Sequence, residues 1–211
     1  MFAGEPWMRG GFGDAMTLLA ATTSLYSGDG QRKYLTEAER ERFLTAASSA
    51  DAPVRTLCLT LAYTGCRISE ALALTANDIQ LSSLLIAIRS LKKRGRLVVR
   101  EVPAPPVLLA QLERVHRLKA AQRTAAATTL LWPWGRTTAW RLVKGVMREA
   151  GIQQRSASPK GLRHGFGVHA VRSGVPLNLI QKWLGHENIA TTAIYTDVLG
   201  PEEREIAARM W

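Results

Sequence analysis

The chain has 211 residues, of which 46% are apolar, so it is long enough for one domain with a packed core, and disorder is not the default expectation. Lys and Arg number 28 against 17 Asp and Glu, a formal net charge of +11, which favours a polyanion as partner. The longest apolar runs are far too short for a membrane helix, and the apolar stretch 16–21 lacks the basic segment of a secretion signal. These features predict a cytoplasmic protein with no membrane partner.

The composition divides the chain into three parts. Residues 1–30 are rich in Gly, Ser and Thr and carry more acidic than basic side chains, so we expect them to form a flexible leader. Residues 31–198 hold the positive charge and are expected to form the folded domain. Residues 199–211 form a tail with helical character, for which we expect docking on a neighbouring subunit. Cys58 and Cys66 lie too far apart along a helix for a disulfide.

Helical periodicity dominates the first and last thirds of this domain. Thr36 followed by Glu37 and Glu39 is typical of a helix start and predicts a helix over 37–49. Two further helices are expected over about 53–63 and 69–74. From residue 105 the apolar spacing predicts five helices, over about 105–123, 137–150, 160–173, 176–184 and 188–195.

Between these regions, residues 84–103 have the periodicity of strands. Leu84, Ile86 and Ile88 alternate with other residues, and a cluster of basic residues around Gly95 precedes a second apolar run. This pattern predicts a β-hairpin with a basic tip. The expected fold class is therefore mostly α with a small antiparallel β-hairpin or sheet.

Four stretches place polar side chains at helix ends or on one helix face. TGCRISEAL puts Arg67 after a tight turn, PKGLRHGFG sets Lys160 and Arg163 three residues apart, LGH ends a helix at His186, and Tyr195 follows nine residues later. Each stretch alone has an ordinary structural explanation, such as a surface ion pair, a helix C-cap or a core aromatic residue. Their common order and spacing favour a joint role.

With these motifs the chain resembles the tyrosine recombinase (phage integrase) family. TGCRISEAL resembles the first arginine box of the family, PKGLRHGFG the second, and LGH with its tyrosine the third. The resemblance covers residues 34–198. It implies the integrase catalytic fold and an enzyme that breaks and rejoins DNA, similar in size to the fimbrial-switch inverting recombinases, which consist of the catalytic domain alone.

The chemistry of phosphodiester transfer agrees with that resemblance. Tyr195 is the expected nucleophile, and its attack would conserve the bond energy in a 3′-phosphotyrosyl link. Arg67 and Arg163 are expected to hold the two non-bridging oxygens, because planar guanidinium groups suit that geometry. His186 would donate to one of these oxygens or help to take the phenolic proton.

Two lysines complete the set that the resemblance implies. The family's hairpin lysine protonates the leaving 5′ oxygen, and Lys92 matches it best, with Lys93 as a close second. Lys160 stands where most recombinases have His and where type IB topoisomerases tend to have Lys. Because a protonated lysine cannot accept a proton, we expect Lys160 to supply positive charge. His164 is expected to point elsewhere on its helix.

The expected reaction needs no cofactor and no metal, since the phosphotyrosyl link replaces ATP and no acidic cluster suits Mg²⁺. Double-stranded DNA is the expected partner. Self-association into a tetramer on paired sites, accessory DNA-bending proteins and an origin on a mobile element or plasmid fit the same interpretation. Integration, excision, inversion and resolution stay open as outcomes. Two alternatives also stay open, a type IB topoisomerase-like activity and a catalytically silent DNA-binding regulator.

Overall fold

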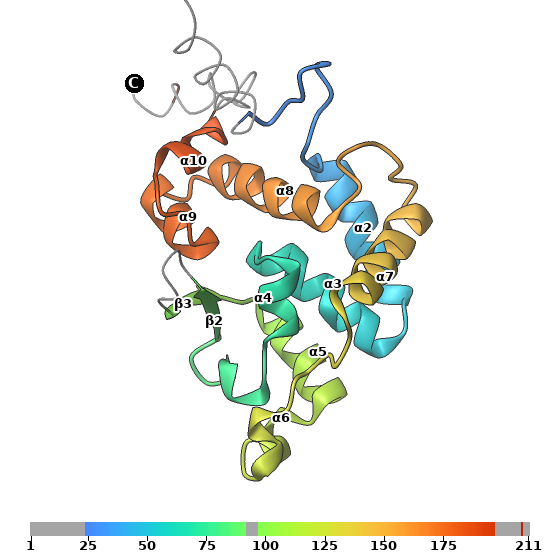
Figure 1. The fold of residues 1–211 in the computed structure, drawn as a ribbon, viewed down its shortest axis with the longest axis vertical. Helices are drawn as coiled ribbons and strands as arrows, with labels where there is room; N and C mark the ends of the chain where they lie inside the picture. Colours follow the sequence, from blue (N-terminus) through green and yellow to red (C-terminus); the bar gives the residue numbers. More distant parts are fainter. Residues whose placement is uncertain (1–23, 92–96, 197–207, 209–211) are drawn as a thin grey trace, which may run out of the picture.

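The computed structural model of the protein describes residues 24–91, 97–196 and 208, and within them helices make up most of the fold, with a small sheet at one side (Figure 1). The sheet is antiparallel in the order β1-β2-β3. The helices are α2 (Glu37–Ser49), α3 (Ala52–Thr64), α4 (Ile68–Leu72), α5 (Pro106–His116), α6 (Leu118–Ala121), α7 (Arg136–Glu149), α8 (Pro159–Arg172), α9 (Leu177–Leu184) and α10 (Ala190–Ala193). The strands are β1 (Ile79–Gln80), β2 (Leu85–Leu91) and β3 (Leu97–Pro103), and two short 3-10 helices are η1 (Ala76–Asp78) and η3 (Ala125–Thr128). The predicted fold class is confirmed.

The predicted start of the first helix is confirmed in detail. The side chain of Thr36 accepts a hydrogen bond from the backbone N–H of Glu39, and the carboxylate of Glu39 accepts one from the backbone N–H of Thr36 at 2.8 Å. This reciprocal pair satisfies two N–H groups that the helix itself leaves unpaired. The same carboxylate pairs with Arg32 at 2.6 Å, which joins the preceding segment to α2.

Two of the predicted elements differ from the structure, and one strand was not predicted. The helix expected over 105–123 is interrupted at Arg117, which has φ +51°, so the chain forms α5 and α6 instead. The helix expected over 188–195 is reduced to the four residues of α10. Strand β1, which was not expected, has two residues, too few to produce a recognisable alternation. In each case long-range packing decides what local periodicity does not.

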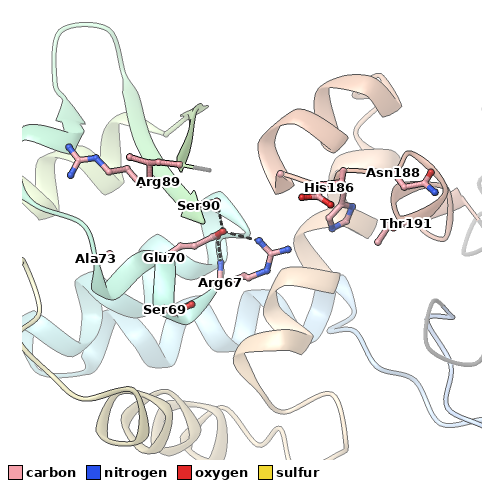
Figure 2. A pocket seen from close by; sticks show the side chains of 12 residues that line it. Arg67, Ser69, Glu70, Ala73, Arg89, Ser90, His186, Asn188 and Thr191 are labelled. Atoms are coloured by element: carbon pink, nitrogen blue, oxygen red, sulfur yellow. Dashed lines mark hydrogen bonds and ion pairs between the residues drawn. The ribbon is translucent and has the colours of Figure 1, made fainter. Parts of the chain in front are cut away.

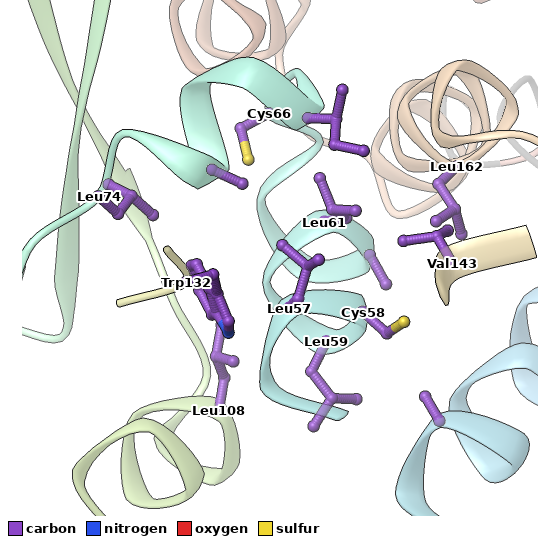
Figure 3. Close-up of a cluster of buried hydrophobic side chains, with 14 of the residues drawn as sticks. Leu57, Cys58, Leu59, Leu61, Cys66, Leu74, Leu108, Trp132, Val143 and Leu162 are labelled. Carbon is purple, nitrogen blue, oxygen red and sulfur yellow. The ribbon is translucent and has the colours of Figure 1, made fainter. Parts of the chain in front are cut away.

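The main apolar core surrounds α3, whose residues point toward several neighbouring elements (Figure 3). Leu57 and Leu61 are completely buried there, and Trp132 packs beside them with its indole N–H donating to the carbonyl of Pro53 at 2.9 Å. Trp132 thereby fixes its loop to the core. Both cysteines are free and buried, and burial raises the pKa of Cys58 to about 12 and that of Cys66 to about 11.

A second, smaller apolar cluster joins the C-terminal part of α8 to α9 and to Tyr195, which follows α10, and it includes Leu25 from the segment before α2. Leu25 is only 1% exposed, and its carbonyl accepts a hydrogen bond from Lys33 at 2.8 Å. The predicted boundary of the flexible leader at residue 30 is therefore too late, because an apolar side chain before it is buried in the fold. Residues 1–23 and all of the tail except residue 208 lie outside the described residues. In the described part of the chain, no helix has the length and apolar character needed to cross a membrane.

Candidate active site

Arg67 lies at the start of α4, where Glu70 fixes its orientation. The backbone N–H of Arg67 donates to Glu70 Oε2, and its guanidinium donates to Glu70 Oε1, both at 2.8 Å. The side chain of Arg67 nevertheless stays 49% exposed. Figure 2 shows its guanidinium and the imidazole of His186 facing the same space from two different elements. Arg67 is therefore oriented by the protein and still open to a ligand.

Glu70 itself is buried in a polar network that reaches the β-hairpin. Arg100 of β3 pairs with Glu70 at 2.7 Å, and Ser90 of β2 donates to Glu70 at 2.6 Å. Burial alone would raise the pKa of Glu70, but the hydrogen bonds and charge of Arg100, together with Ser90, lower it to about 2. The carboxylate is thus ionised at neutral pH and ties α4 to both strands of the hairpin.

Arg163 of α8 is buried and lies between two chain segments. Its guanidinium donates to the carbonyl of Gly65 at 2.9 Å and to that of Leu184 at 2.7 Å. These carbonyls take two of its five N–H donors, so the group can still donate to an anion. Burial and the charge of Arg67 lower the pKa of Arg163 to about 10, which leaves it charged at neutral pH.

Two arginines together fix the end of α9. Arg163 binds the carbonyl of Leu184, and Arg100 donates to the carbonyl of Trp183 at 2.7 Å. The last carbonyls of a helix lack partners within the helix and carry partial negative charge, so both contacts are favourable. Gly185 follows with φ +68°, and a Cβ there would lie 3.1 Å from Arg100 Nη1. Glycine therefore allows the turn that presents His186.

His186 is half-buried and its Nδ1 lies 2.9 Å from the hydroxyl of Thr192. Burial, followed by the charges of Arg163 and Arg67, lowers the pKa of His186 to about 3. The imidazole is consequently neutral at neutral pH. If the hydroxyl of Thr192 donates to Nδ1, the Nε2–H of this ring is available as a donor to an anion between the arginines.

Tyr195 follows α10 and is a member of the smaller apolar cluster. It is 1% exposed, and its ring lies so close to Gly167 that a Cβ at that position would be 2.5 Å from the ring. The ring is nearly parallel to that of His186, at 19° with centroids 6.3 Å apart. Its hydroxyl lies 3.2 Å from His164 Nδ1. Burial raises the pKa of Tyr195 to about 12, although Arg163 and Arg67 act in the opposite direction.

One cavity of about 440 Å³ brings most of the expected residues together. Arg67, Lys160, Arg163 and His186 all line it, and so does Ile194, the residue before Tyr195. No acidic side chain is among the described residues that line it. A larger neighbouring cavity of about 780 Å³ shares Arg67 and His186 with it and extends toward the hairpin. The concentration of positive charge suits an anionic ligand.

The expectation that His164 points away from the site is wrong, since His164 lines the same cavity as Arg163. Lys92 and Lys93 lie outside the described residues. The sequence also gave no reason to single out Arg100, because its contacts reach 30 residues back to Glu70 and 83 residues forward to Trp183. Among the residues that the structure describes, no group of three or more His, Cys, Asp or Glu side chains is arranged to hold a metal ion.

Comparison with known sequences gives a single consistent result. The model described as the phage integrase family matches residues 33–200. Tyrosine recombinase XerA of Pyrococcus furiosus is 31% identical over 185 residues, which cover 84% of this chain and 61% of the relative. Tyrosine recombinase XerD of Mycobacterium tuberculosis is 35% identical over 149 residues, covering 69% and 48%. The chain spans about half to three-fifths of the length of the curated relatives it matches.

Solved structures agree with this result. A crystal structure of XerA recombinase has a TM-score of 0.68 at 30% identity and covers 84% of this chain and 62% of that one. The XerH site-specific recombinase in a post-cleavage complex with a palindromic difH substrate has a TM-score of 0.67 at 22% identity, covers 83% and 52%, and supports the fold alone. With the family model covering most of its length, this chain belongs to the phage integrase family of tyrosine recombinases.

Proposed function

We propose that this chain cleaves and rejoins double-stranded DNA as the catalytic part of a site-specific tyrosine recombinase. The observation that carries the proposal is the cavity that Arg67, Lys160, Arg163 and His186 line together, with Tyr195 directly after one of its lining residues. Three cationic side chains around one cavity suit the charge of a phosphodiester. A phenol beside them supplies a nucleophile that can form a covalent intermediate.

In the proposed step, Oη of Tyr195 attacks the phosphorus, the bond from phosphorus to the 5′ oxygen breaks, and a 3′-phosphotyrosyl link remains. Arg67 and Arg163 hold the two non-bridging oxygens while negative charge develops on them, and His186 donates to one of the two. Each such donor is worth about 3 kcal/mol of transition-state stabilisation. Rejoining reverses the step with the 5′ hydroxyl of another strand.

The proposal requires Tyr195 to move. Its ring is buried and does not line the cavity in this structure, whereas the neighbouring Ile194 does. Because α10 has only four residues and Tyr195 follows it, a small shift of this short segment would bring the hydroxyl to a phosphate bound in the cavity without unfolding α8 or α9. His164, which lies beside the hydroxyl, already lines that cavity, so the two groups can stay in contact during the shift.

We also propose Lys92 as the acid that protonates the leaving 5′ oxygen. Its support is the match of its position to the family's hairpin lysine and its place directly after β2, whose residue Ser90 contacts Glu70 of the site. A 5′-bridging phosphorothiolate substrate tests the assignment, since a thiolate leaves without a proton. The sulfur should restore cleavage to Lys92→Ala, and Lys93→Ala should need no restoration. Restoration of Lys93→Ala alone would assign the role to Lys93 instead.

The partners follow from the same proposal. Double-stranded DNA is the substrate, two sites are held by a tetramer, and residues 199–211 dock on a neighbouring subunit. Accessory DNA-bending proteins and a cytoplasmic location are compatible with this arrangement. The net charge of +11 supports strong electrostatic binding, so the affinity for duplex DNA should fall steeply as salt rises.

The decisive experiment is covalent capture from a pool of nicked duplexes with random sequence around the nick. The nick lets a short product diffuse away and traps the protein on the 3′ phosphate. Wild-type protein should form an adduct on a subset of sequences, and sequencing that subset gives the target site. Tyr195→Phe, which removes one hydroxyl and no charge, should bind the selected duplex and form no adduct. An adduct that persists in this variant would remove Tyr195 from the role.

One observation favours a second candidate, a type IB topoisomerase-like activity. Lys160 lines the cavity at a position where that related class tends to have lysine. The two candidates differ in what they do with two sites. A recombinase exchanges strands between two copies of its selected sequence, whereas a topoisomerase relaxes a supercoiled plasmid that lacks this sequence.

A further inference from the structure

The hydroxyl of Tyr195 has a partner that the proposed mechanism has not used. His164 Nδ1 lies 3.2 Å from Tyr195 Oη, and the two ring centroids are 6.0 Å apart. His164 also lines the cavity that Arg67 and Arg163 line. It therefore touches both the nucleophile and the space proposed for the phosphate. We infer that His164 takes the phenolic proton of Tyr195 during cleavage and returns it during rejoining, an inference that rests on the proposed function.

Both rings are held in this arrangement by the same helix. Tyr195 packs against Gly167 of α8, and His164 lies three residues earlier on α8, close to one helical turn away. The phenol thus crosses the helix at the glycine and its hydroxyl reaches the histidine. A larger residue at position 167 would push the ring away, because its Cβ would lie 2.5 Å from Tyr195.

The other groups near the phenol are poor proton acceptors. Lys160 is exposed, and the ammonium group of a lysine has donors but no acceptor. Arg67 and Arg163 have no lone pair to offer. His186 uses Nδ1 toward Thr192, and its ring lies parallel to that of Tyr195 rather than edge-on to the hydroxyl. Of the described side chains around Tyr195 Oη, His164 has the chemistry that proton transfer needs, and because it also lines the cavity it can stay beside the hydroxyl when Tyr195 approaches a bound phosphate.

The charges around His164 keep it unprotonated before DNA binds. Burial lowers the pKa of His164 to about 4, and Lys160, Arg163 and Lys33 act in the same direction. Arg67, Arg136 and His186 line the same cavity from other elements, and none of them carries negative charge. A bound phosphodiester brings negative charge into this cavity and so raises the proton affinity of His164. The phenol oxygen becomes strongly acidic as it bonds to phosphorus, which lets the proton pass at that moment.

The step is balanced and reversible. A lone pair of Tyr195 Oη forms the bond to phosphorus, and the bond from phosphorus to the 5′ oxygen breaks. The proton of Tyr195 Oη moves to His164 Nδ1. The leaving 5′ oxygen receives its proton from a separate acid, for which Lys92 is proposed above. In rejoining, the imidazolium of His164 returns its proton to the departing phenolate.

The test compares single-turnover cleavage by wild-type protein, His164→Gln and His164→Ala between pH 6 and pH 9.5, on the duplex selected by covalent capture. Glutamine can still hydrogen-bond the phenol but cannot take its proton. His164→Gln should be slower by about 10²-fold at pH 7. Its rate should rise about tenfold per pH unit, because hydroxide must replace the histidine, while the wild-type rate stays nearly flat. Added imidazole should speed His164→Ala.

His169→Gln is the matched control. His169 lies on the same helix, and its Nδ1 contacts Glu37 at 2.7 Å, away from Tyr195. This variant should match wild type in rate and pH profile. His164→Gln with a rate within threefold of wild type and a flat profile would overturn the inference. The inference would also be overturned if His164→Ala cleaved slowly while His164→Gln cleaved at the wild-type rate. That result would mean that His164 only holds the hydroxyl in place.

Two measurements on the wild-type protein complete the test. If they fail to fold, nitrogen NMR of wild-type His164 decides: at pH 7 Nδ1 should be unprotonated, and Tyr195→Phe should shift its resonance. A protonated Nδ1 would overturn the inference. If wild-type protein forms no adduct with any duplex of the pool, the proposed function fails and this inference fails with it. Adduct formation by wild type with unaffected His164 variants overturns the inference alone.

Discussion

Two apolar clusters of unequal size face each other across the candidate site. The larger cluster packs α2, α3, α5 and α7 against the sheet and supports α4, which begins at Arg67. The smaller cluster joins the C-terminal part of α8 to α9, and it includes Tyr195 itself, which follows α10. Figure 1 shows α8, α9 and α10 side by side at one end of the molecule. The phosphate-binding side of the site thus rests on a large core, whereas the nucleophile is part of a small one. Changes to the small cluster should affect cleavage more than overall stability.

Two buried arginines connect the clusters. Arg163 joins the end of α3 to the end of α9, and Arg100 joins the hairpin and Glu70 to the same end of α9. Helix α8 also belongs to both sides, with Leu162 in the larger cluster and Phe166 in the smaller. The relative position of Arg67 and Tyr195 therefore depends on a few polar contacts, and these contacts are the best places to separate stability from catalysis.

The largest loss of stability is expected for Arg100→Met. Arg100 and Glu70 are 6% and 7% exposed, so removing the cation leaves a buried carboxylate with less compensation. Breaking such a pair on one side costs about 3–5 kcal/mol. Urea denaturation should show this loss in the free energy of unfolding. In the double variant Glu70→Gln with Arg100→Met, part of the loss should be recovered, because the amide is neutral and its oxygen can still accept from the Arg67 N–H. No recovery would mean that the packing of Arg100, rather than its charge, is what matters.

Acid should weaken the smaller cluster first. The pKa values of His164 and His186 are lowered from 6.5 to about 4 and about 3, so the unfolded chain binds more protons than the fold in this window. Their contribution is complete above pH 6.5 and is lost as pH falls toward 4. Because both rings are only partly buried, we expect at most about 1 kcal/mol from each by pH 5.5. Urea midpoints measured at pH 7.5, 6.5 and 5.5 should fall in that order.

Glu70 should affect the free energy of unfolding in a separate, lower pH range. Its folded pKa of about 2 lies below its ordinary 4.5, so its contribution is complete above pH 4.5 and is lost as pH falls from there. His164→Gln combined with His186→Gln should reduce the slope of the stability profile between pH 7.5 and 5.5 and leave the loss below pH 4.5 intact. A smaller slope should remain in the upper range, because burial also lowers the pKa of His116. If stability still falls steeply between pH 7.5 and 5.5 in the variant that lacks both histidines, the loss in this pH range comes from other groups.

A moderate effect is expected for Gly167→Ala. The new Cβ would lie 2.5 Å from the ring of Tyr195, so the ring must shift. Overpacking of this kind costs about 1–3 kcal/mol. Because the strain falls on the nucleophile, cleavage of the selected duplex should fall by more than the loss in stability implies.

Gly145→Ala on α7 is the matched control. Its Cβ meets nothing within 4 Å, and alanine should stabilise the helix by about 0.5–1 kcal/mol. Equal effects of the two changes would contradict the role of Gly167.

The sequence predicted local features well and long-range ones poorly. The bounds of α2 followed from Thr36 and Glu39, and the hairpin followed from the alternation around Ile86 and Ile88, because these signals lie within a few residues. The order of the site residues was available through their motifs. Three features could not be predicted from the sequence: the break at Arg117, the role of Arg100 and the position of His164. Arg100 and His164 depend on contacts between segments far apart in the chain, for example the 31 residues between His164 and Tyr195. The break at Arg117 is a left-handed residue that is not glycine, which the apolar spacing does not reveal.

The smallest change in stability, with a large change in catalysis, is expected for Arg67→Ala. Its guanidinium is half exposed and pairs with Glu70 three residues on, and such pairs contribute less than about 1 kcal/mol. Arg100 and Ser90 would still hold Glu70 after the substitution. Cleavage of the selected duplex should nevertheless fall by about 10²- to 10³-fold, because a charged donor to the phosphate is lost. Arg67→Lys should recover only part of this rate, since lysine keeps the charge but lacks the planar pair of donors. Single-turnover rates beside urea unfolding curves test both statements on the same samples. If Arg67→Ala lost several kcal/mol in stability, Arg67 would, like Arg100, connect the two clusters structurally. The proposed difference between the two arginines would then be wrong.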